Sequence, residues 1–392
     1  MTFTDHPTKA PLTPSQRPEN ERHILSLVRQ AGAMSKADIA RATGLSAQSA
    51  TNIVNRLEDE GLLRAGESVR GRVGQPSKPY AIDPEGALTI GVKIGRQSVE
   101  IATMGFDYRI IEHRRTRYDY PIYDTVRTQI LDTTRDLIDG LGPDRAARVL
   151  GIGLSLPDAL SSWESTIGAP EGSMAPWDVS DLRAEIEATF AMPVSQMNDA
   201  SAACLAALKL GQTTDAQSFM YVYVGTFAGG GLAIDGRVFE GRTGNAAAIG
   251  SMPMQVVRTG GGQQLIDAAS LHHLEDMAEA AGLDPQVFYA DAPLDETAAR
   301  VLDDWIAVAA PALAFTFVAG QAILDLGTVV LDTSLSDALR ARLVEATRAA
   351  CPRYDTRGLR PFRIIAGDLG VTARSLGSAL LPFQAVTEFD LM

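Results

Sequence analysis

Cysteine is nearly absent from this chain, with only Cys204 and Cys351 among 392 residues. Two cysteines so far apart exclude a disulfide-rich secreted fold, and we expect both to be free, buried thiols in a reducing compartment. The first twenty residues lack the apolar segment that a signal peptide requires. They predict a flexible, Pro- and Thr-rich arm over residues 1–19 of a cytoplasmic protein.

Long apolar runs are also rare, and the one candidate for a membrane span covers residues 305–324. It has about the length of a spanning helix, but alanine rather than leucine dominates it, and it contains Pro311, Gly320 and Gln321. We therefore predict a soluble protein that has no membrane partner. The run is expected either to be buried in a core or to contribute to a dimer interface.

Positive charge is scarce and unevenly distributed, because the net charge of −13 divides into +3 for residues 1–82 and −16 for the remainder. A mildly basic N-terminal segment followed by an acidic remainder is typical of a DNA-binding domain joined to a domain that does not contact phosphates. With 45% apolar and 21% charged residues, the chain is globular. Its length suffices for two or three domains.

Residues 34–63 carry the signals of two short helices separated by a tight turn. Ser35, with Asp38 three residues later, is expected to cap the first helix, and Ser46 is expected to cap the second. An apolar stripe follows the i, i+3, i+4, i+7 rule on the second helix, at Ala50, Ile53, Val54 and Leu57. This design predicts a helix-turn-helix, although an ordinary helical hairpin in a core would share the pattern.

The face of the second helix opposite that stripe carries amide, hydroxyl and guanidinium groups. Such groups read base edges in a major groove, whereas the acidic residues 58–60 would repel phosphate. We predict that DNA is contacted from the start and the outer face of this helix, by Ser46, Gln48, Ser49, Thr51, Asn52, Asn55 and Arg56.

Residues 64–83 predict a β-hairpin wing with a Gly- and Pro-rich tip. Basic and amide side chains crowd the tip, at Arg70, Arg72, Gln75 and Lys78. They suit the phosphate backbone or the minor groove, and we predict DNA contacts by Arg72, Gln75 and Lys78, with a solvated basic hairpin as the alternative. A first helix over residues 20–31 completes a winged helix-turn-helix domain at residues 20–83.

The remainder alternates between strand and helix signals. Three short apolar bursts over residues 88–118 predict an antiparallel meander. Further strands are expected at 149–157, 193–197, 219–225, 328–332 and 362–367, and helices at 125–141, 180–190 and 199–210. Strand-rich and then helix-rich segments, repeated twice, predict an α/β body of two lobes of similar plan.

Five motifs follow one another in this body: SLP at 155–157, Trp177, PVSQMNDASAACLA at 193–206, YVYVGTFAGGGLAIDG at 221–236 and GNAAAIGSM at 244–252. With the helix-turn-helix, they resemble the transcription-regulator branch of the ROK family (repressors, open reading frames and sugar kinases). The resemblance implies two RNase-H-like lobes of the actin/hexokinase/Hsp70 type (the ASKHA fold) with ligand in the cleft between them. Lobe 1 is then expected at residues 84–197, completed by a C-terminal helix at about 368–392, and lobe 2 at residues 198–367.

The kinase motifs of that family are altered at three places. Lys93 replaces the carboxylate of the family's Asp-x-Gly-x-Thr turn, and a lysine cannot coordinate the metal of a Mg-nucleotide. Phe227 stands in the glycine-rich turn at 225–231, where the backbone would have to approach a phosphate closely. Asp332 and Thr333 replace the adenosine-side Gly-Gly. We predict that the body is not an enzyme and needs no cofactor.

The sugar contacts implied by the resemblance are only partly kept. Asn198 and Asp199 remain, whereas Ser173, Ala248 and Ser251 stand at other contact positions. Asp199 corresponds to the catalytic base of the kinases and would here accept a hydrogen bond from an effector hydroxyl. Asn198 and Asp199 could equally cap the following helix. We predict that these five residues meet an effector less polar than a hexose, or that no effector binds.

The zinc site of many relatives needs one His and two or more Cys ligands. Ser251 stands at the His position here, and the corresponding run at 259–264 contains no cysteine. His272 and His273 are adjacent on a predicted helix and therefore do not face one way. We expect no structural metal.

These features together predict a transcriptional repressor of carbohydrate or related metabolism genes. It would bind double-stranded operator DNA as a homodimer or a dimer of dimers. A sugar-like effector would change how the two DNA-binding domains are placed relative to each other. Two alternatives stay open: a sugar kinase with a DNA-binding appendage, and a ligand-free dimeric DNA-binding scaffold.

Overall fold

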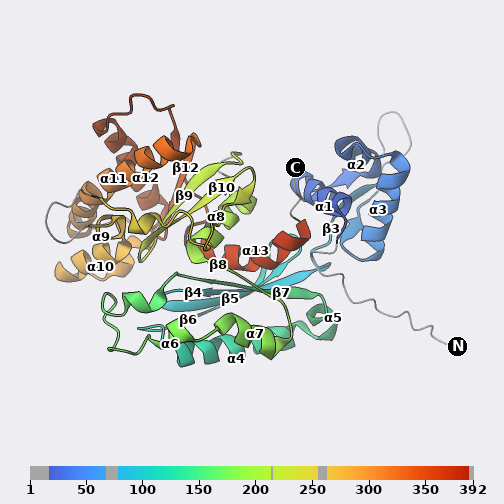
Figure 1. Cartoon of the computed structure of the whole chain (residues 1–392), viewed down its shortest axis with the longest axis horizontal. Coiled ribbons are helices and arrows are strands. Elements are labelled where there is room, and N and C mark those ends of the chain that lie inside the picture. The colour runs from blue at the N-terminus through green and yellow to red at the C-terminus, as the bar shows by residue number, and fades with distance from the viewer. Residues whose placement is uncertain (1–16, 68–77, 213–214, 255–262, 388–392) are drawn as a thin grey trace. The chain divides into compact units, whose positions relative to one another are not determined.

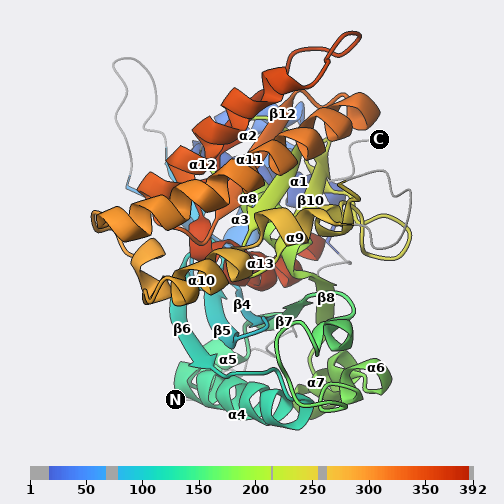
Figure 2. The same cartoon turned by 90° about the vertical axis from the view of Figure 1, so that its left-hand side faces the viewer.

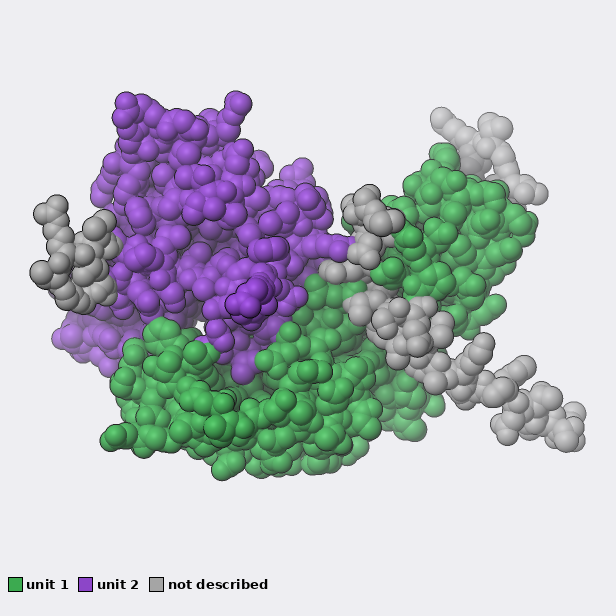
Figure 3. Space-filling model, viewed as in Figure 1, with its two compact units in different colours: residues 1–154, 159–196, 378–392 green, residues 155–158, 197–377 purple. Residues whose placement is uncertain are grey.

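The computed structural model describes four stretches of the chain, residues 17–67, 78–212, 215–254 and 263–387. They fall into two compact units, coloured green and purple in Figure 3. Unit 1 comprises residues 1–154, 159–196 and 378–392, and unit 2 comprises residues 155–158 and 197–377.

The first part of unit 1 is a winged helix-turn-helix (Figure 1). Its elements are α1 (Glu19–Ala31), β1 (Met34–Ser35), α2 (Lys36–Thr43), α3 (Ala47–Asp59), β2 (Leu63–Ala65) and β3 (Pro79–Ile82). Strand β3 pairs antiparallel with both β1 and β2. Apolar side chains without exposed surface form the core: Ile24, Leu25, Val28, Ile39, Ala50, Val54 and Leu57. Three residues of the stripe predicted on the second helix lie in this core, and Ile53 is half-buried.

An arginine ties this domain to the rest of unit 1. The Arg29 guanidinium lies over the Tyr108 ring, 3.7 Å from its centroid, and over the Phe106 ring at 4.6 Å. It also donates a hydrogen bond to the Phe106 carbonyl oxygen. Burial lowers the pKa of Arg29, so the two ring faces and the carbonyl must replace the water that the cation has lost.

A five-stranded sheet of order β6-β5-β4-β7-β8 forms the body of unit 1. The predicted meander is present as β4 (Leu88–Ile94), β5 (Ser98–Gly105) and β6 (Ile110–Arg117), with β7 (Val149–Leu156) and β8 (Val194–Asn198) beside it. Helices α4 (Tyr123–Leu141) and α7 (Leu182–Phe190) cover one face, and α13 (Ala373–Thr387) lies on the other (Figure 1). Shorter helices connect these elements: α5 (Pro143–Ala146), η2 (Leu160–Trp163) and α6 (Pro176–Val179).

Two glycines let α13 approach this sheet closely. A Cβ on Gly91 would lie 2.4 Å from the Ala379 nitrogen, and a Cβ on Gly153 would lie 1.9 Å from the Ser378 oxygen. No larger residue fits at either position without moving the helix. Thr89 fixes the contact, because its hydroxyl donates to the Ala379 carbonyl oxygen at 2.7 Å.

Unit 2 is built on a second sheet, of order β11-β10-β9-β12-β13. Its strands are β9 (Phe219–Val224), β10 (Ala228–Ile234), β11 (Arg237–Val238), β12 (Thr328–Thr333) and β13 (Arg363–Ala366). Strands β9, β12 and β13 run parallel, whereas β10 and β11 are antiparallel neighbours. Its helices are α8 (Asp199–Leu210), η3 (Ile249–Ser251), α9 (Leu265–Ala269), α10 (Leu271–Ala280), η4 (Pro285–Phe288), α11 (Glu296–Leu324), α12 (Asp337–Ala350), η5 (Cys351–Arg353) and η6 (Gly370–Thr372). The predicted α/β class is confirmed.

Alternate residues of β9 face different helices, as strand geometry requires. Tyr221 belongs to a core cluster with Ala203 and Cys204 of α8. Met220 points the other way, because its side chain lies 2.9 Å from where a Cβ on Gly320 of α11 would stand. The sheet is therefore buried on both faces.

The long helix α11 contains the apolar run noted in the sequence and begins nine residues earlier, at Glu296. By length and composition alone it could cross a membrane, but 56% of its most apolar window is buried inside the protein. The buried side includes Trp305, whose indole nitrogen donates to the Ser270 carbonyl oxygen at 3.1 Å. One side of α11 is thus a core face of unit 2. Figure 2 shows α11 running alongside α12.

Candidate DNA-binding surface and effector-site residues

Side-chain caps fix the start of both helices of the helix-turn-helix. The Ser35 hydroxyl accepts from the Asp38 N–H at 3.2 Å, and the Ser46 hydroxyl accepts from the Ser49 N–H at 3.1 Å. Gly44 ends α2 with a φ of 69°, a left-handed conformation that favours glycine. Ser46 is therefore first a capping residue, and its hydroxyl also lies 2.8 Å from that of Ser49.

Most of the predicted DNA-reading residues are exposed on α3, namely Gln48, Ser49, Asn52, Asn55 and Arg56. Thr51 differs, because it is half-buried and its hydroxyl donates to the Ala47 carbonyl oxygen at 2.7 Å. The outer face of α3 thus offers amides and a guanidinium, while Thr51 is held against its own helix.

Two hydrogen bonds orient the amides of this face. The Gln48 side-chain nitrogen donates to the Asn52 side-chain oxygen at 2.9 Å, and the Lys36 ammonium of α2 donates to the Asn55 side-chain oxygen. Both bonds use an amide oxygen as the acceptor and leave the amide nitrogens of Asn52 and Asn55 outside the contact. Each remaining amide nitrogen is a donor that suits an acceptor on a base edge, such as a purine N7.

Arg56 is part of an ionic network that the sequence did not reveal. Its guanidinium pairs with Glu21 of α1, a carboxylate that is only 2% exposed. Arg17 binds the other Glu21 oxygen at 3.1 Å and Glu60 at 2.9 Å. The i, i+4 spacing of Arg17 and Glu21 was the one signal in the sequence for this network. Arg56 therefore holds α3 to α1 as well as facing outward.

The wing is only partly described. Strands β2 and β3 bracket it, and Lys78 is exposed beside β3. Arg70, Arg72 and Gln75 lie outside the described residues.

Of the predicted effector residues, four belong to unit 2 and Ser173 to unit 1. In unit 2, the Asn198 side-chain oxygen accepts from the Ala200 N–H at 2.9 Å and from the Ser201 N–H at 3.4 Å, and so caps α8. Asp199 is 8% exposed and pairs with Arg374 at 3.3 Å. The capping interpretation is correct for Asn198, whereas Asp199 already has a cationic partner.

The other effector positions are less enclosed. Ala248 and Ser251 are exposed at either end of η3. Ser173 is half-buried, and its hydroxyl makes no hydrogen bond with any residue that the structure describes. Across those same residues, no three His, Cys, Asp or Glu side chains converge to hold a metal ion.

Lys93 lies on β4 opposite Glu100 of β5, and both are almost fully buried. Its ammonium lies 3.3 Å from one carboxylate oxygen of Glu100, and His113 lies 3.2 Å from the other. The Lys93 side chain also fills the space beside Gly95, because a Cβ there would be 2.6 Å from the lysine nitrogen. Lys93 is thus enclosed in an internal ion pair.

Asp332 is likewise enclosed, with no exposed surface. Its carboxylate accepts from the Tyr221 hydroxyl at 3.2 Å and from the N–H groups of Thr333 at 2.8 Å and Gly370 at 3.1 Å. Arg340 forms an ion pair with it at 3.2 Å. Burial nonetheless raises the pKa of Asp332, with Arg340 acting in the opposite direction.

The glycine-rich turn contacts the start of α10. The N–H groups of Leu271 and His272 donate to the carbonyl oxygens of Gly225 and Thr226 at 2.9 and 3.1 Å. The Phe227 ring stands edge-on to the His272 ring, with centroids 5.8 Å apart. These two helix amides are therefore occupied by the chain's own carbonyls.

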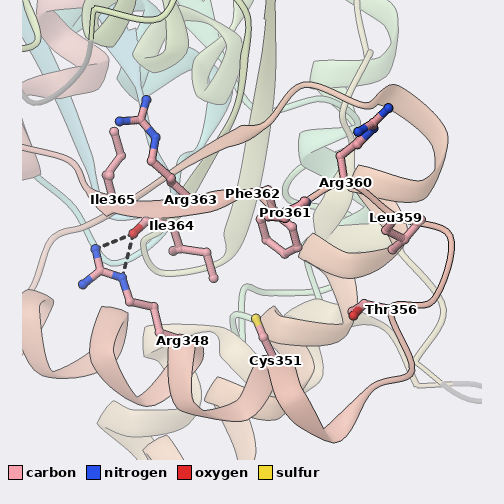
Figure 4. A pocket seen from close by; sticks show the side chains of 10 residues that line it. All are labelled: Arg348, Cys351, Thr356, Leu359, Arg360, Pro361, Phe362, Arg363, Ile364 and Ile365. Atoms are coloured by element: carbon pink, nitrogen blue, oxygen red, sulfur yellow. Dashed lines mark hydrogen bonds between the residues drawn. The ribbon is translucent and has the colours of Figure 1, made fainter.

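Unit 2 also has a cavity of about 530 Å³ beside β13, which sequence reasoning did not find (Figure 4). It is lined by Arg348, Cys351, Thr356, Leu359, Arg360, Pro361, Phe362, Arg363, Ile364 and Ile365. The Arg348 side chain crosses to the edge strand, where its Nε donates to the Ile364 carbonyl oxygen at 2.7 Å. None of the predicted effector residues lines this cavity.

Comparison with known proteins agrees with this architecture. Residues 89–384 match the ROK family, and residues 17–64 match a winged helix-turn-helix DNA-binding family. The transcriptional dual regulator NagC of Escherichia coli K12, and its counterpart in strain O157:H7, the N-acetylglucosamine repressor, are each 22% identical over 237 residues, covering 60% of this chain and 57% of theirs. The chain thus spans less than two thirds of those relatives.

Solved structures show the same fold. A ROK family transcriptional regulator, a homologue of the E. coli MLC protein, matches 94% of this chain and 96% of its own with a TM-score of 0.69 at 19% identity. A ROK glucokinase from Streptomyces griseus, in complex with glucose and AMPPNP, matches 76% of this chain and 100% of its own with a TM-score of 0.56 at 20% identity. The chain belongs to the ROK family and joins a sugar-kinase-like body to a winged helix-turn-helix DNA-binding domain, as that family's transcriptional regulators do.

Proposed function

We propose that this protein represses genes of carbohydrate or related metabolism by binding operator DNA in the cytoplasm. The observation that carries the proposal is the outer face of α3, where Gln48, Asn52 and Asn55 are exposed on a helix capped and packed as a reading helix. A core hairpin would bury this face. Residues 1–82 carry a net charge of +3, which attracts DNA phosphates, whereas the remainder carries −16 and repels them.

We further propose that the body does not transfer phosphate. Lys93 is held by Glu100, and the Asp332 carboxylate is saturated by partners from its own unit. A Mg-nucleotide would have to break a buried ion pair at either position, at a cost of about 3–5 kcal/mol for each broken pair. Asp199, which corresponds to the kinase base, is neutralised by Arg374.

A small effector would act through the residues around Asp199. An effector that carries a hydroxyl or an anionic group could compete with one partner of the Asp199–Arg374 pair, which is only partly enclosed, with side chains 11% and 15% exposed. The relatives named as an N-acetylglucosamine repressor make amino sugars and related sugars the first compounds to test.

The test is to recover the genomic DNA that the full chain binds and to measure its affinity by fluorescence anisotropy. Asn52→Ala should weaken operator binding by about 1–3 kcal/mol and relax the sequence preference, because it removes a base-directed amide. Arg41→Ala on α2, also exposed but off the predicted reading face, is the control. Equal operator affinity for the wild type and for Gln48→Ala and Asn52→Ala would refute the assignment of α3.

A sugar kinase with a DNA-binding appendage is the second candidate, because the glucokinase structure shares the fold of the body. Calorimetry with Mg-ATP, followed by assay of sugar-dependent ADP release, separates the two. Micromolar nucleotide affinity with turnover would establish the kinase. A ligand-free scaffold is the third candidate, and thermal-shift screening against sugars tests it. An effector at 100 times its Kd should add about 2.7 kcal/mol to the free energy of unfolding, so the absence of stabilisation by any compound would favour the scaffold.

A further inference from the structure

Lys36 stands at the start of α2, between strand β3 of the wing and the predicted reading helix. The residue before it, Ser35, caps α2 and pairs with Pro79, so the first turn of the helix is held beside β3. The Lys36 ammonium lies over the Tyr80 ring, 4.8 Å from its centroid, and donates a hydrogen bond to the Asn55 side-chain oxygen of α3. Lys36 therefore contacts the wing and the reading helix at once.

The surroundings of Lys36 hold its ammonium group in one place. Tyr80 is 4% exposed and is paired with Met34 of β1, so its ring is a fixed surface beside the start of α2. Lys36 itself is half-buried. A cation is attracted to the face of an aromatic ring, and a partly desolvated cation also needs a hydrogen-bond acceptor. Asn55 supplies that acceptor from the neighbouring helix.

An ammonium partner fixes which way round the Asn55 amide lies. A lysine has three N–H donors and no acceptor, so only the amide oxygen can face it, and the amide nitrogen is turned away. Gln48 and Asn52 instead contact each other, and two amides can exchange their donor and acceptor roles. Of these three exposed amides, Asn55 is therefore the one whose orientation is set by a charged partner.

We propose that Lys36 is a positioning residue for base recognition, and that it makes Asn55 a hydrogen-bond donor to the base that it reads. The inference rests on the proposed function, in which α3 enters the major groove of operator DNA. Gln48, Asn52 and Asn55 follow one another at spacings of four and three residues, so they share one exposed face of α3. The amide nitrogen of Asn55 is thus available to a base edge at that face.

The orientation of the amide decides which base edge fits. An asparagine that is free to turn pairs with adenine, because its oxygen accepts from N6 while its nitrogen donates to N7. In this protein the Asn55 oxygen is bound to the Lys36 cation, which repels the partial positive charge of a base amino group. Edges that offer acceptors alone are N7 and O6 of guanine and O4 of thymine. Guanine offers two acceptors, so we expect guanine first and thymine second at the position that Asn55 reads.

The first test measures the affinity of the full chain, by fluorescence anisotropy, for four operators that differ in the base at this position. The position is identified as the one where Asn55→Ala loses discrimination. The wild type should bind the guanine operator roughly tenfold more tightly than the adenine or the cytosine operator. Lys36→Met keeps a long side chain over Tyr80 but removes the donor and the charge, so the amide can turn and accept adenine. Its preference for guanine over adenine should be lost.

Lys36→Arg and Lys78→Met are the matched controls. Arginine keeps a cationic donor that can lie over Tyr80, so Lys36→Arg should retain the preference for guanine. Lys78→Met removes the same charge from an exposed site beside β3, and it should weaken binding to all four operators equally. Hydrogen exchange over α2 and α3 checks that Lys36→Met keeps the fold.

The second test reverses the chemistry and does not depend on the folding of Lys36→Met. Asn55→Asp keeps the pairing with Lys36 but presents an acceptor to the base instead of a donor. The preference should change from guanine to cytosine, whose N4 amino group donates. In an Asn55→Ala background, Lys36→Met should leave the relative affinities for the four operators unchanged, because Lys36 acts through Asn55.

The outcomes separate this inference from the proposed function. Equal weakening of all four operators by Lys36→Met, with a flatter slope of log affinity against log salt, would assign Lys36 to a phosphate and overturn the inference. A change of base preference in the Asn55→Ala background would show that Lys36 reads the base itself, which also overturns it. A wild type that prefers adenine at this position, or a Lys36→Met variant that still prefers guanine, overturns the inference and leaves the proposed function intact. A wild type without any sequence preference refutes the proposed function, and the inference with it.

Discussion

Arg56 should affect both the stability of the DNA-binding domain and its recognition of DNA, and the two effects can be measured separately. Its guanidinium faces outward on α3 but is paired with Glu21, whose carboxylate is 2% exposed. Arg56→Ala removes one partner of that carboxylate and leaves Arg17 as the other, at 3.1 Å. Glu21→Gln removes the charge of the carboxylate and leaves Arg56 in place.

The expected cost follows from burial. The Arg56 side chain is 51% exposed, so solvent screens the pair and the pair alone contributes about 1 kcal/mol. The desolvation of the carboxylate oxygen that loses its donor brings the total cost to about 1–3 kcal/mol. We therefore expect Arg56→Ala to destabilise α1 and α3 by about 1–3 kcal/mol, which is a roughly 5- to 150-fold loss of protection against amide exchange when opening is local.

Hydrogen exchange read over α1 and α3 in the full chain is the assay, because a multi-unit protein does not melt in one step. Arg56→Ala and Glu21→Gln should both speed exchange in these helices, whereas Asn52→Ala should not. In DNA binding, Arg56→Ala should lose sequence preference and Glu21→Gln should keep it. Unchanged exchange in Arg56→Ala, or relaxed preference in Glu21→Gln, would refute this division of roles.

Four further outcomes are expected. Ser46→Ala should destabilise the start of α3 by about 1 kcal/mol, seen as faster exchange of residues 47–50, and Ser46→Asp should restore the cap but weaken DNA binding by repelling phosphate. In native protein, Ellman's reagent should titrate Cys351 and leave Cys204 unreacted until the chain unfolds, because burial raises the pKa of the Cys204 thiol and leaves it no exposed surface. Burial raises the folded-state pKa of Asp332 above the ordinary 3.8, so the folded state holds its proton more tightly and this group's contribution to stability falls as pH rises through that window. The difference in unfolding free energy between wild type and Asp332→Asn should therefore favour the wild type more at pH 4 than at pH 7, and the opposite trend would contradict the assignment. Arg72→Ala should lower affinity for all DNA and reduce the slope of log affinity against log salt by about one, with an unchanged slope excluding a phosphate contact.

Local signals in the sequence predicted the helix-turn-helix well. The caps at Ser35 and Ser46 and the apolar stripe at Ala50, Val54 and Leu57 lie where spacing placed them, because each depends on neighbours within one or two turns. The ion pair between Arg56 and Glu21 joins residues on different helices, so no periodicity in the sequence predicts it. Similarly, the 305–324 run could be read as a core helix, but only the fold shows which side of it is left uncovered.

The predicted effector site was harder, because capping and ligand binding use the same residue types. The sequence leaves Asn198 open between a ligand contact and a helix cap, and in the structure its side chain caps α8. The partner of Asp199 is Arg374, which is far away in sequence and carried no signal of its own. Long-range ion pairs of this kind depend on the packing of whole elements, which sequence spacing does not encode.

The same packing explains how this kinase-like fold holds charged residues in its interior. A buried lysine or aspartate is tolerated only with partners that replace its hydration, and Lys93 and Asp332 each have partners from within their own unit. Helix α13 supplies such a partner in unit 2, where Arg374 pairs with Asp199. In unit 1, Phe383 of the same helix packs with its ring centroid 5.5 Å from that of Phe106. Phe106 in turn lies under Arg29 of the DNA-binding domain. The same rule holds for the Arg29 cation, whose lost water is replaced by two ring faces and a carbonyl oxygen.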